Sequence, residues 1–551
     1  MRTTALAVQP GARSARWKAL WLLLGLAAAA PAATRPKLVI LIVAEQFRPD
    51  YLDRYRPSFA AGGFNRLLKE GAVFRQCRYE YVATFPASGA AVLATGAYPD
   101  RTGIVAEYWY DRKNRRVVSA VEDPEQALVG SEQPRRPAAS PFRLVGTTLA
   151  DQLRLATRGR SRAVSLSLRD QTAVLLGGRR PAGCYWVDEA GRFVTSTYYS
   201  DTLPAWVSSF QQEHPPLRFR GRAWKAIDAS ETAPPLRVID GQGPEALADF
   251  FAAWLASPLA MEQQFDFARA AIEGESLGGG AGGDLLILSV SSLYFLGLEV
   301  GADSPLLRDL VLRLDRKLED FFAWLDARLG LPNVWIGFTA TQGLSEVPEA
   351  LPAEGLPGGR VAGEQIAAAV NARLSAVFGR DRYVEKYLFP SLYLNRRVVS
   401  DLASRYAGNG RGMGGAGALA AEVARLAGEA ALEVPGVAGY LVPNGAAAFL
   451  SPESAPLMAR SLYPERSGDL LIAYQPYYSE LYGDGRGVSP GSFYSYDTHV
   501  PLLLYGAPFR AQTFDRAVSP TDLAPTLAAA LEAPPPSSST GRPLVEALKD
   551  R

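Results

Sequence analysis

Residues Lys37–Ala44 read KLVILIVA, an unbroken apolar run that is rich in β-branched side chains. Such a run is typical of a strand that is buried on both faces at the centre of a parallel sheet. The run ends at Glu45-Gln46, which places a carboxylate at the carboxyl end of the strand. Open α/β sheets bind their ligands at that edge. The stretch therefore predicts an α/β fold with a candidate site at Glu45.

The rest of the chain repeats this rhythm of apolar strands and helices. Leu306–Leu329 carries apolar residues at helical spacing, and a second helix is predicted at Glu364–Phe378. The alternation predicts a doubly wound, mostly parallel sheet that is sandwiched by helices. We expect one large domain over residues 34–551. Irregular composition predicts insertions, including a cap region, around 204–281 and 350–465. The further strands are expected at Ala163–Leu168, Asp284–Ser291, Asn333–Ala340, Asp469–Gln475 and Val500–Tyr505.

A second informative stretch is Tyr81–Gly96, YVATFPASGAAVLATG. It predicts the end of a strand, a tight polar turn and a helix of small residues. Pro86 suits the first helical turn, and Thr84 and Ser88 are candidate N-cap residues. A hydroxyl at such a turn lies among free backbone N–H groups, a position that suits a nucleophile or a bound phosphate.

Composition excludes two classes of function. The 551 residues are 48% hydrophobic and 21% charged, which is ordinary for a globular protein. The net charge of +2 argues against a nucleic-acid binder that is held by phosphate contacts. The chain contains two histidines, His214 and His499, so no mechanism that needs three imidazoles is available to it.

The first 33 residues are predicted to form a signal peptide or an N-terminal anchor. A basic region precedes the apolar run Ala19–Ala30, and Ala30-Pro31-Ala32 fits a signal-peptidase site. The run is shorter than the about 20 apolar residues that a membrane span needs. We therefore expect an exported protein, periplasmic or extracellular, with an uncleaved anchor as the alternative. After export, Cys77 and Cys184 can form a disulfide or remain two buried free thiols.

The motifs together resemble the alkaline phosphatase superfamily, in the branch of secreted zinc-dependent alkaline phosphatases and type I phosphodiesterases/nucleotide pyrophosphatases. The resemblance implies two zinc ions that are held by three histidines and three aspartates, with a Thr or Ser nucleophile between them. Two such metals stabilise both the attacking and the leaving oxygen of a phosphate ester. The matching stretches, in family order, are Ile42–Leu52, Tyr81–Gly96, Gly103–Arg112, Gly191–Tyr199, Asp284–Gly301, Phe338–Pro348, Gly491–Gly506 and Asp522–Ala528.

Carrying this site over position by position predicts that it is degenerate. The nucleophile position falls on Pro86, which has no hydroxyl; Thr84, in Thr84-Phe85-Pro86, is a weaker alternative. Other polar positions of the family fall on Glu107, Arg169 and Gln171, which with Glu45 would line a relic pocket. The resemblance thus predicts no two-zinc centre and no zinc cofactor. The six ligand positions fall on Glu45, Tyr294, Leu298, Thr341, Gln342 and Pro490.

Single residues of this relic pocket leave alternatives open. Glu45 can bind Mg²⁺ or Ca²⁺, although few other carboxylates fall at the site. Arg169 can hold a phosphate or pair with Glu45 or Glu107, and we favour the ion pair. For Thr84 we favour a capping role over a nucleophilic one. His499 is predicted to be a structural histidine near the start of a strand.

Three functional hypotheses follow. The leading one is a catalytically degraded pseudophosphatase with a binding or scaffolding role in the cell envelope, toward a protein partner or a small anionic ligand. The second is an active phosphatase or phosphodiesterase that hydrolyses phosphate mono- or diesters with a site reorganised around Glu45 and Thr84. The third is a structural component of the envelope. None of them involves nucleic acid, and the membrane enters only through an uncleaved N-terminal segment.

Overall fold

The computed structural model describes residues 35–132, 137–230, 232–241, 243–280, 282–408, 416–443, 447–448, 454–481 and 485–549. Contacts divide the chain into Met1–Arg35 with Arg551, and Pro36–Asp550. Nearly all described residues belong to the second unit. The predicted signal or anchor at 1–33 and most of the glycine-rich loop at 408–417 lie outside the described residues.

Strand β1 (Leu38–Ala44) is buried along its whole length, as the run KLVILIVA predicts. It pairs in parallel with β12 (Asp284–Val290) on one side and β13 (Val334–Ala340) on the other. Strand β7 (Ala163–Ser167) extends the parallel part beyond β12. The carboxyl ends of these strands therefore meet at one edge of the sheet, where Glu45 follows β1.

The main sheet has eleven strands within the described residues, in the order β22-β2-β21-β13-β1-β12-β7-β8-β9-β5-β6. This confirms the predicted α/β class, although the sheet is more mixed than predicted. β21 runs antiparallel to both of its neighbours, and the β9-β5-β6 edge is also antiparallel. The strands not yet bounded are β22 (Gln512–Val518), β2 (Ala72–Arg78), β21 (His499–Tyr505), β8 (Gly183–Val187), β9 (Phe193–Ser196), β5 (Glu122–Val129) and β6 (Pro137–Ala139).

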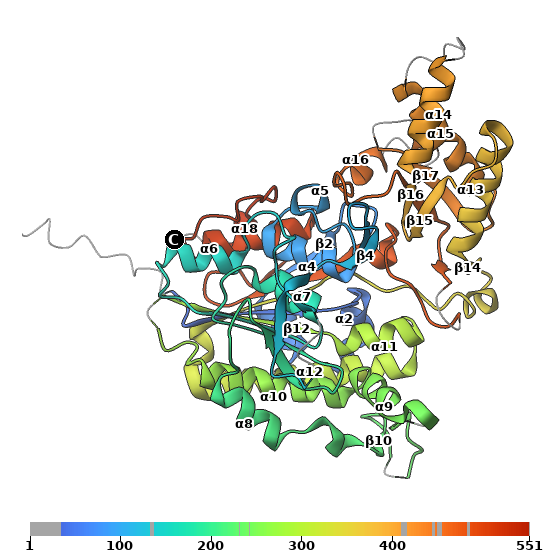
Figure 1. Cartoon of the computed structure of the whole chain (residues 1–551). Helices are drawn as coiled ribbons and strands as arrows, with labels where there is room; N and C mark the ends of the chain where they lie inside the picture. The colour runs from blue at the N-terminus through green and yellow to red at the C-terminus, as the bar shows by residue number, and fades with distance from the viewer. Residues whose placement is uncertain are drawn as a thin grey trace, which may run out of the picture. The chain divides into compact units, whose positions relative to one another are not determined.

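Helices cover both faces of this sheet (Figure 1). α4 (Pro86–Thr95), α6 (Leu149–Ala156), α7 (Asp170–Gly177) and α18 (Leu523–Ala530) contact one another above the strands in this view. Below them lie α10 (Pro258–Gly274), α11 (Ser292–Val300) and α12 (Pro305–Leu329). The predicted apolar stripe of α12 is buried, so this helix packs its amphipathic face toward the core.

A second sheet with its own hydrophobic core follows β13 in the chain. Helices α13 (Gly363–Phe378) and α15 (Ala416–Leu432) pack together, and α15 contacts two of its strands. The strand predicted at Asp469–Gln475 exists as β19, but it belongs to this sheet and not to the main one. An ion pair of 2.6 Å between Arg112 Nη2 and Asp469 Oδ2 ties it to the main domain. The strands of this sheet are β15 (Val384–Leu388), β16 (Ser391–Leu394), β19 (Leu470–Tyr474), β17 (Val437–Leu441) and β18 (Ala447–Ala448).

The region predicted as an insertion at 204–281 contains helices α8 (Ala205–Glu213), α9 (Ala246–Leu255) and α10. His214 caps the end of α8, where its ring stacks on Phe210 with centroids 4.3 Å apart. The other short elements are β10 (Arg222–Trp224), β11 (Arg237–Ile239), α2 (Asp50–Arg54), α3 (Phe64–Glu70), α5 (Pro99–Thr102), β3 (Tyr108–Asp111), β4 (Arg116–Ser119), β14 (Gly359–Val361), α14 (Arg396–Gly408), α16 (Ser454–Ala459), β20 (Tyr478–Glu480) and α17 (Ser495–Thr498).

The two cysteines are separate. Cys77 and Cys184 are both buried free thiols, so the structure contains no disulfide between them. Burial raises the pKa of each thiol, which keeps both protonated at neutral pH. Among the described residues, no helix combines the length and apolar character that a membrane crossing requires.

Candidate functional site

The side chain of Glu45 is completely buried at the end of β1 and is held by four polar groups. Its Oε1 accepts hydrogen bonds from the hydroxyls of Thr172 (2.9 Å), Ser289 (2.8 Å) and Ser291 (2.7 Å). Its Oε2 accepts from Arg169 Nη1 at 2.7 Å. Four donors stabilise a buried carboxylate that would otherwise be costly to desolvate. Glu45 is therefore a fully hydrogen-bonded group in this structure.

Arg169 lies between two carboxylates. Its Nη1 pairs with Glu45, and its Nη2 donates to Glu107 Oε1 and, at 2.9 Å, to Gln171 Oε1. The guanidinium carbon lies 3.9 Å from the centre of the Tyr294 ring, a cation–π contact. Burial lowers the pKa of Arg169, but Tyr294, Glu107 and Glu45 together raise it well above its ordinary value. Arg169 therefore forms the ion pair that we favoured over a bound phosphate, and it forms one with Glu45 and another with Glu107.

Gln171 and Tyr294 complete this network. Gln171 Nε2 donates to the backbone carbonyl of Glu107 and to Ser119 Oγ, at 3.1 Å each. The Tyr294 hydroxyl donates to Glu107 Oε2 at 3.3 Å. Burial, and then the negative charge of Glu107, raise the pKa of Tyr294, so it remains a neutral donor. We call Glu45, Glu107, Arg169, Gln171 and Tyr294 the arginine network.

The turn before α4 keeps its predicted shape, but two of its residues have other roles than predicted. Pro86 is the first residue of the helix, as expected. The N-cap position is occupied by Phe85 and not by Thr84 or Ser88. Ser88 Oγ, one turn in, accepts from Phe85 N at 3.2 Å, and Thr84 Oγ1 donates to the Ser492 carbonyl. Thr84 therefore joins this turn to the loop before β21, and its hydroxyl is engaged there.

The other ligand positions do not join the arginine network through any described hydrogen bond. Thr341 and Gln342 follow β13 and are completely buried, and Pro490 is half-buried in the loop before β21. Thr341 Oγ1 and both amide atoms of Gln342 have no hydrogen-bond partner within the described residues. Leu298 lies on α11, where its carbonyl accepts from Val488 N at 2.8 Å.

The Arg169 guanidinium lies between Glu45 and Glu107. A cavity of about 560 Å³ opens beside it and is lined by Arg169, Asp170 and Gln171 on one side. Its other charged lining residues are Glu132, Asp188, Glu189 and Arg192, and Arg192 already pairs with Asp188 and Glu132. Carboxylates outnumber arginines on this wall, and the arginines are paired. The cavity therefore does not favour a small anion.

The motif Tyr496-Asp497-Thr498-His499 contributes a residue that sequence reasoning missed. His499 is a structural histidine at the start of β21, as predicted: its Nε2 bonds to the Arg75 carbonyl at 2.7 Å. The neighbouring Asp497 is buried and accepts hydrogen bonds from the backbone N–H and hydroxyl of Ser492. Burial raises the pKa of Asp497 from 3.8 to about 7.

We expect Asp497 to make stability depend on pH. A carboxyl whose pKa is raised on folding keeps its proton in the native state while the unfolded chain loses it. The free energy of unfolding should then fall as pH rises from about 4 to about 7, by about 1.4 kcal/mol per pH unit for this group. Urea unfolding between pH 4.5 and 7.5 should show a shallower decline in Asp497→Asn than in the wild type. Equal slopes in the two proteins would contradict the assignment to Asp497.

Comparisons with known proteins identify the family. The type I phosphodiesterase / nucleotide pyrophosphatase family matches residues 39–361. The chain is 30% identical to alkaline phosphatase PhoV of Synechococcus elongatus, over 94% of this chain and 93% of that protein. It is 29% identical to alkaline phosphatase PafA of Elizabethkingia meningoseptica, over 94% and 95%. A crystal structure of wild-type PafA matches with a TM-score of 0.83 and 28% identity, over 94% of this chain and 100% of that one.

The chain therefore belongs to the type I phosphodiesterase / nucleotide pyrophosphatase family of the alkaline phosphatase superfamily, as the sequence motifs predicted. Our prediction that no zinc cofactor is used is contradicted by these comparisons. The relatives are alkaline phosphatases, the class for which the resemblance implies two zinc ions, so family membership argues for zinc.

The described residues at the ligand positions nevertheless do not fit a two-zinc centre. Zinc requires ligands such as imidazole nitrogen, thiolate or carboxylate in nearly tetrahedral geometry. Both oxygens of Glu45 already accept hydrogen bonds, while Thr341 and Gln342 offer neutral hydroxyl and amide groups. In the described part of the chain, no three His, Cys, Asp or Glu side chains are grouped closely enough to hold a metal ion. Family membership thus argues for zinc, whereas the donor groups of the described residues at this site do not fit it.

Proposed function

We propose that this chain is an alkaline-phosphatase-superfamily protein with a degraded catalytic site, and that it acts by binding a protein partner in the cell envelope. The observation that carries this proposal is the arginine network. The guanidinium of Arg169 lies between Glu45 and Glu107, and both carboxylates are engaged with it. A phosphoryl group would have to displace these ion pairs before it could reach Glu45.

The turn before α4 supports the same proposal. A nucleophile requires a free hydroxyl and a base or metal that removes its proton. Pro86 has no hydroxyl, and the Thr84 hydroxyl is hydrogen-bonded to the Ser492 carbonyl. His499 holds the Arg75 carbonyl, and His214 stacks on Phe210 at the end of α8. These contacts engage the Thr84 hydroxyl and the rings of both histidines, so none of these groups is free to act as a nucleophile or a base.

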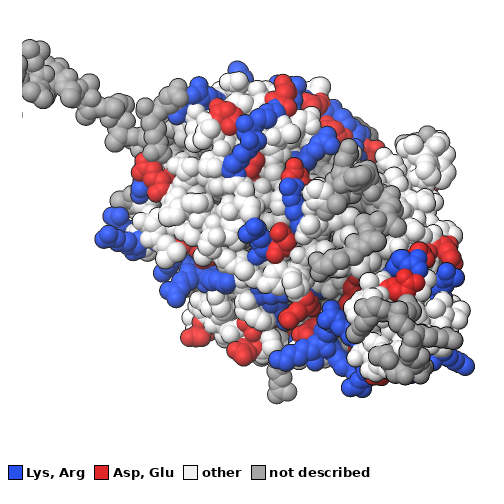
Figure 2. Space-filling model, turned by 90° about the horizontal axis from the view of Figure 1, so that it is seen from above, with Lys and Arg blue, Asp and Glu red and all other residues white. Residues whose placement is uncertain are grey.

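The kind of partner follows from charge. The acidic wall beside Arg169 makes a small anion an unfavourable ligand there, which favours a protein partner over a small anionic ligand. On the face shown in Figure 2, Lys and Arg side chains are interspersed with Asp and Glu. Such a surface lacks the extended positive field that favours nucleic acid. We also propose that the protein is exported and that residues 34–551 form one domain, with insertions near 204–281 and 350–465.

Active hydrolysis is the second candidate, and the comparisons favour it. Relatives that cover nearly the whole chain are named alkaline phosphatases. In that case phosphate mono- or diesters would be hydrolysed at a site reorganised around Glu45 and Thr84. Such a site would require the Thr84 hydroxyl to leave the Ser492 carbonyl and Arg169 to release one of its carboxylates.

Turnover of p-nitrophenyl phosphate and bis-p-nitrophenyl phosphate separates the two candidates. Because the family argues for zinc, purified protein is assayed with and without added Zn²⁺ and its metal content is measured. Under our proposal, rates stay at the buffer background in both conditions, and Thr84→Ala equals the wild type. Zn²⁺-dependent turnover that Thr84→Ala abolishes while Thr84→Ser retains it would establish the hydrolase and overturn the proposal.

A further inference from the structure

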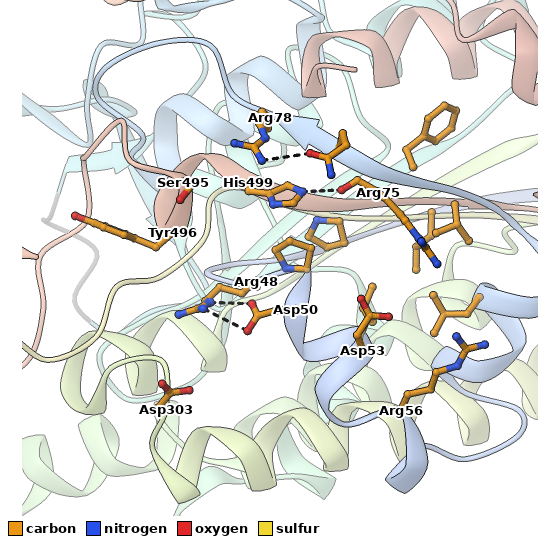
Figure 3. A pocket seen from close by; sticks show the side chains of 18 of the residues that line it. Arg48, Asp50, Asp53, Arg56, Arg75, Arg78, Asp303, Ser495, Tyr496 and His499 are labelled. Carbon is orange, nitrogen blue, oxygen red and sulfur yellow. Dashed lines mark hydrogen bonds and ion pairs between the residues drawn. The ribbon is translucent and has the colours of Figure 1, made fainter. Parts of the chain in front are cut away.

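Two cavities of this protein differ in the balance of charge on their walls. The larger of the two, of about 620 Å³, is bounded by the β1–α2 segment, by β2 and by the start of β21 (Figure 3). Its wall carries as many arginines as carboxylates, and this balance selects neither an anion nor a cation. These residues are Arg48, Arg56, Arg75 and Arg78, with Asp50, Asp53, Asp303 and Glu346. The cavity of about 560 Å³ beside Arg169 has no such balance.

The wall of the cavity beside Arg169 has an excess of negative charge. Its two arginines are each shared between two carboxylates. Arg169 is shared within the arginine network, and Arg192 is shared between Asp188 and Glu132. One guanidinium balances the charge of one carboxylate, so negative charge remains around both arginines. The four carboxylates of the wall are Glu132, Asp170, Asp188 and Glu189.

Asp170 forms no ion pair within the described residues. It is partly buried at the start of α7, where its Oδ1 accepts a hydrogen bond from Gln171 N at 2.7 Å. Burial raises the pKa of Asp170, and neither this hydrogen bond nor the charge of Arg169 offsets the increase. The folded protein therefore leaves the charge of Asp170 only partly compensated. A cation in the cavity would compensate it.

The rest of the wall is apolar and in part aromatic. Two of its large side chains are well exposed, Tyr108 by 51% and Leu247 by 52%. An aliphatic chain in the cavity would cover such surface, at roughly 25 cal/mol for each Å² removed from water. The face of an aromatic ring also attracts a cation. Large apolar residues of the wall include Tyr108, Leu128, Trp186, Leu247, Leu255 and Phe295.

The positions of the carboxylates indicate what kind of cation fits. In the described part of the chain, no three acidic, His or Cys side chains are close enough to hold a metal ion, and this includes the wall. Asp170 and Asp188 follow the neighbouring parallel strands β7 and β8, which places them at the same edge of the sheet. A single ammonium group, such as that of a lysine side chain, would pair with one carboxylate and leave the others. A chain with several ammonium groups on short methylene spacers can meet carboxylates that lie apart.

We propose that this cavity binds a linear aliphatic polyamine. One ammonium group lies at Asp170 and the others lie toward Asp188 and Glu189 in the turn after β8, where they donate charge-assisted hydrogen bonds. The methylene groups lie against the apolar wall near Tyr108. The volume falls within the range of small-molecule sites in proteins, roughly 300–1,000 Å³. This binding requires neither turnover nor a protein partner, so the inference does not depend on the proposed function.

Isothermal titration of the folded protein with matched probes tests the site. Spermidine carries three ammonium groups on one aliphatic chain, Mg²⁺ carries charge without a chain, and butylamine carries a chain with one charge. Trilysine presents several ammonium groups on a peptide. We expect saturable one-to-one binding of spermidine, and at least tenfold weaker binding of each other probe. Absence of saturable spermidine binding, or a control probe that binds as tightly, would overturn the proposal.

Variants locate the binding. Asp170→Asn and Glu189→Gln each remove one negative charge and keep the size of the side chain. Each should weaken spermidine binding about tenfold, with little change in melting temperature. Glu189 is exposed in a turn, so Glu189→Gln still decides the question if Asp170→Asn disturbs α7.

Glu433→Gln is the matched control, because Glu433 is an exposed carboxylate just after α15 and does not line the cavity. It should bind spermidine like the wild type. Wild-type affinity in the folded cavity variants, or an equal loss in Glu433→Gln, would contradict this location.

Discussion

Replacing Arg169 by methionine should lower the free energy of unfolding by about 3–5 kcal/mol, one of the two largest effects that we expect in this protein. Methionine retains much of the side-chain volume but removes the positive charge between Glu45 and Glu107. Glu45 is completely buried, so its charge has no access to water in the folded state. Its three hydroxyl donors stabilise it but do not neutralise it. Urea unfolding at pH 7 measures the loss.

A double variant tests whether the loss arises from unpaired charge. Arg169→Met leaves the buried charge of Glu45 without its cationic partner. Adding Glu45→Gln removes that charge, so the double variant should recover part of the lost stability. Arg115→Met, at an exposed ion pair, should change stability by no more than about 1 kcal/mol. A double variant less stable than Arg169→Met would mean that packing, and not charge, dominates the effect.

Replacing Gly89 by alanine should destabilise the protein by about 3 kcal/mol or more, above the usual range for an overpacked site. Gly89 lies in α4, and an added Cβ would stand 2.1 Å from the carbonyl oxygen of Thr341. That neighbour is backbone that follows the central strand β13, so it cannot turn aside as a side chain can. The helix would have to move away from the sheet edge. Thermal and urea unfolding measure the cost.

Gly417 provides the matched control for this substitution. It lies in the first turn of α15, where an added Cβ meets no atom within 4 Å. Alanine has the higher helix propensity, so Gly417→Ala should leave stability unchanged or raise it by up to about 1 kcal/mol. If Gly89→Ala were tolerated equally well, α4 would not be held as closely against β13 as the structure has it.

The fold was predictable where a segment carries its own signal. β1, β12 and β13 are buried on both faces, and their apolar runs read as central strands without reference to the rest of the chain. The α12 stripe was equally clear, because burial on one face imposes helical spacing. The apolar run of β19 predicts a strand, but the strand lies in the second sheet and not in the main one. A short apolar run does not state which strand it pairs with.

The candidate site was predictable in its residues but not in its bonds. Glu45, Glu107 and Arg169 were selected from family positions, and their mutual pairing follows from charge. The hydroxyls of Ser289 and Ser291 were missed, although they alternate along the end of β12 and so lie on one side of it. The sequence predicts a capping role for Thr84, whereas its hydroxyl donates to the carbonyl of Ser492, more than 400 residues away in the chain. No local pattern contains such a contact.

The position of β21 has a consequence for how this protein is made. It lies between β13 and β2, yet it consists of residues near the end of the chain, His499–Tyr505. Until a ribosome has synthesised them, β13 has an unpaired edge, and β2, completed over 400 residues earlier, has no neighbour through which to join the sheet. Such edges invite association with other chains. We therefore expect a nascent chain of this protein to gain from a chaperone that covers these strand edges until His499–Tyr505 have been synthesised.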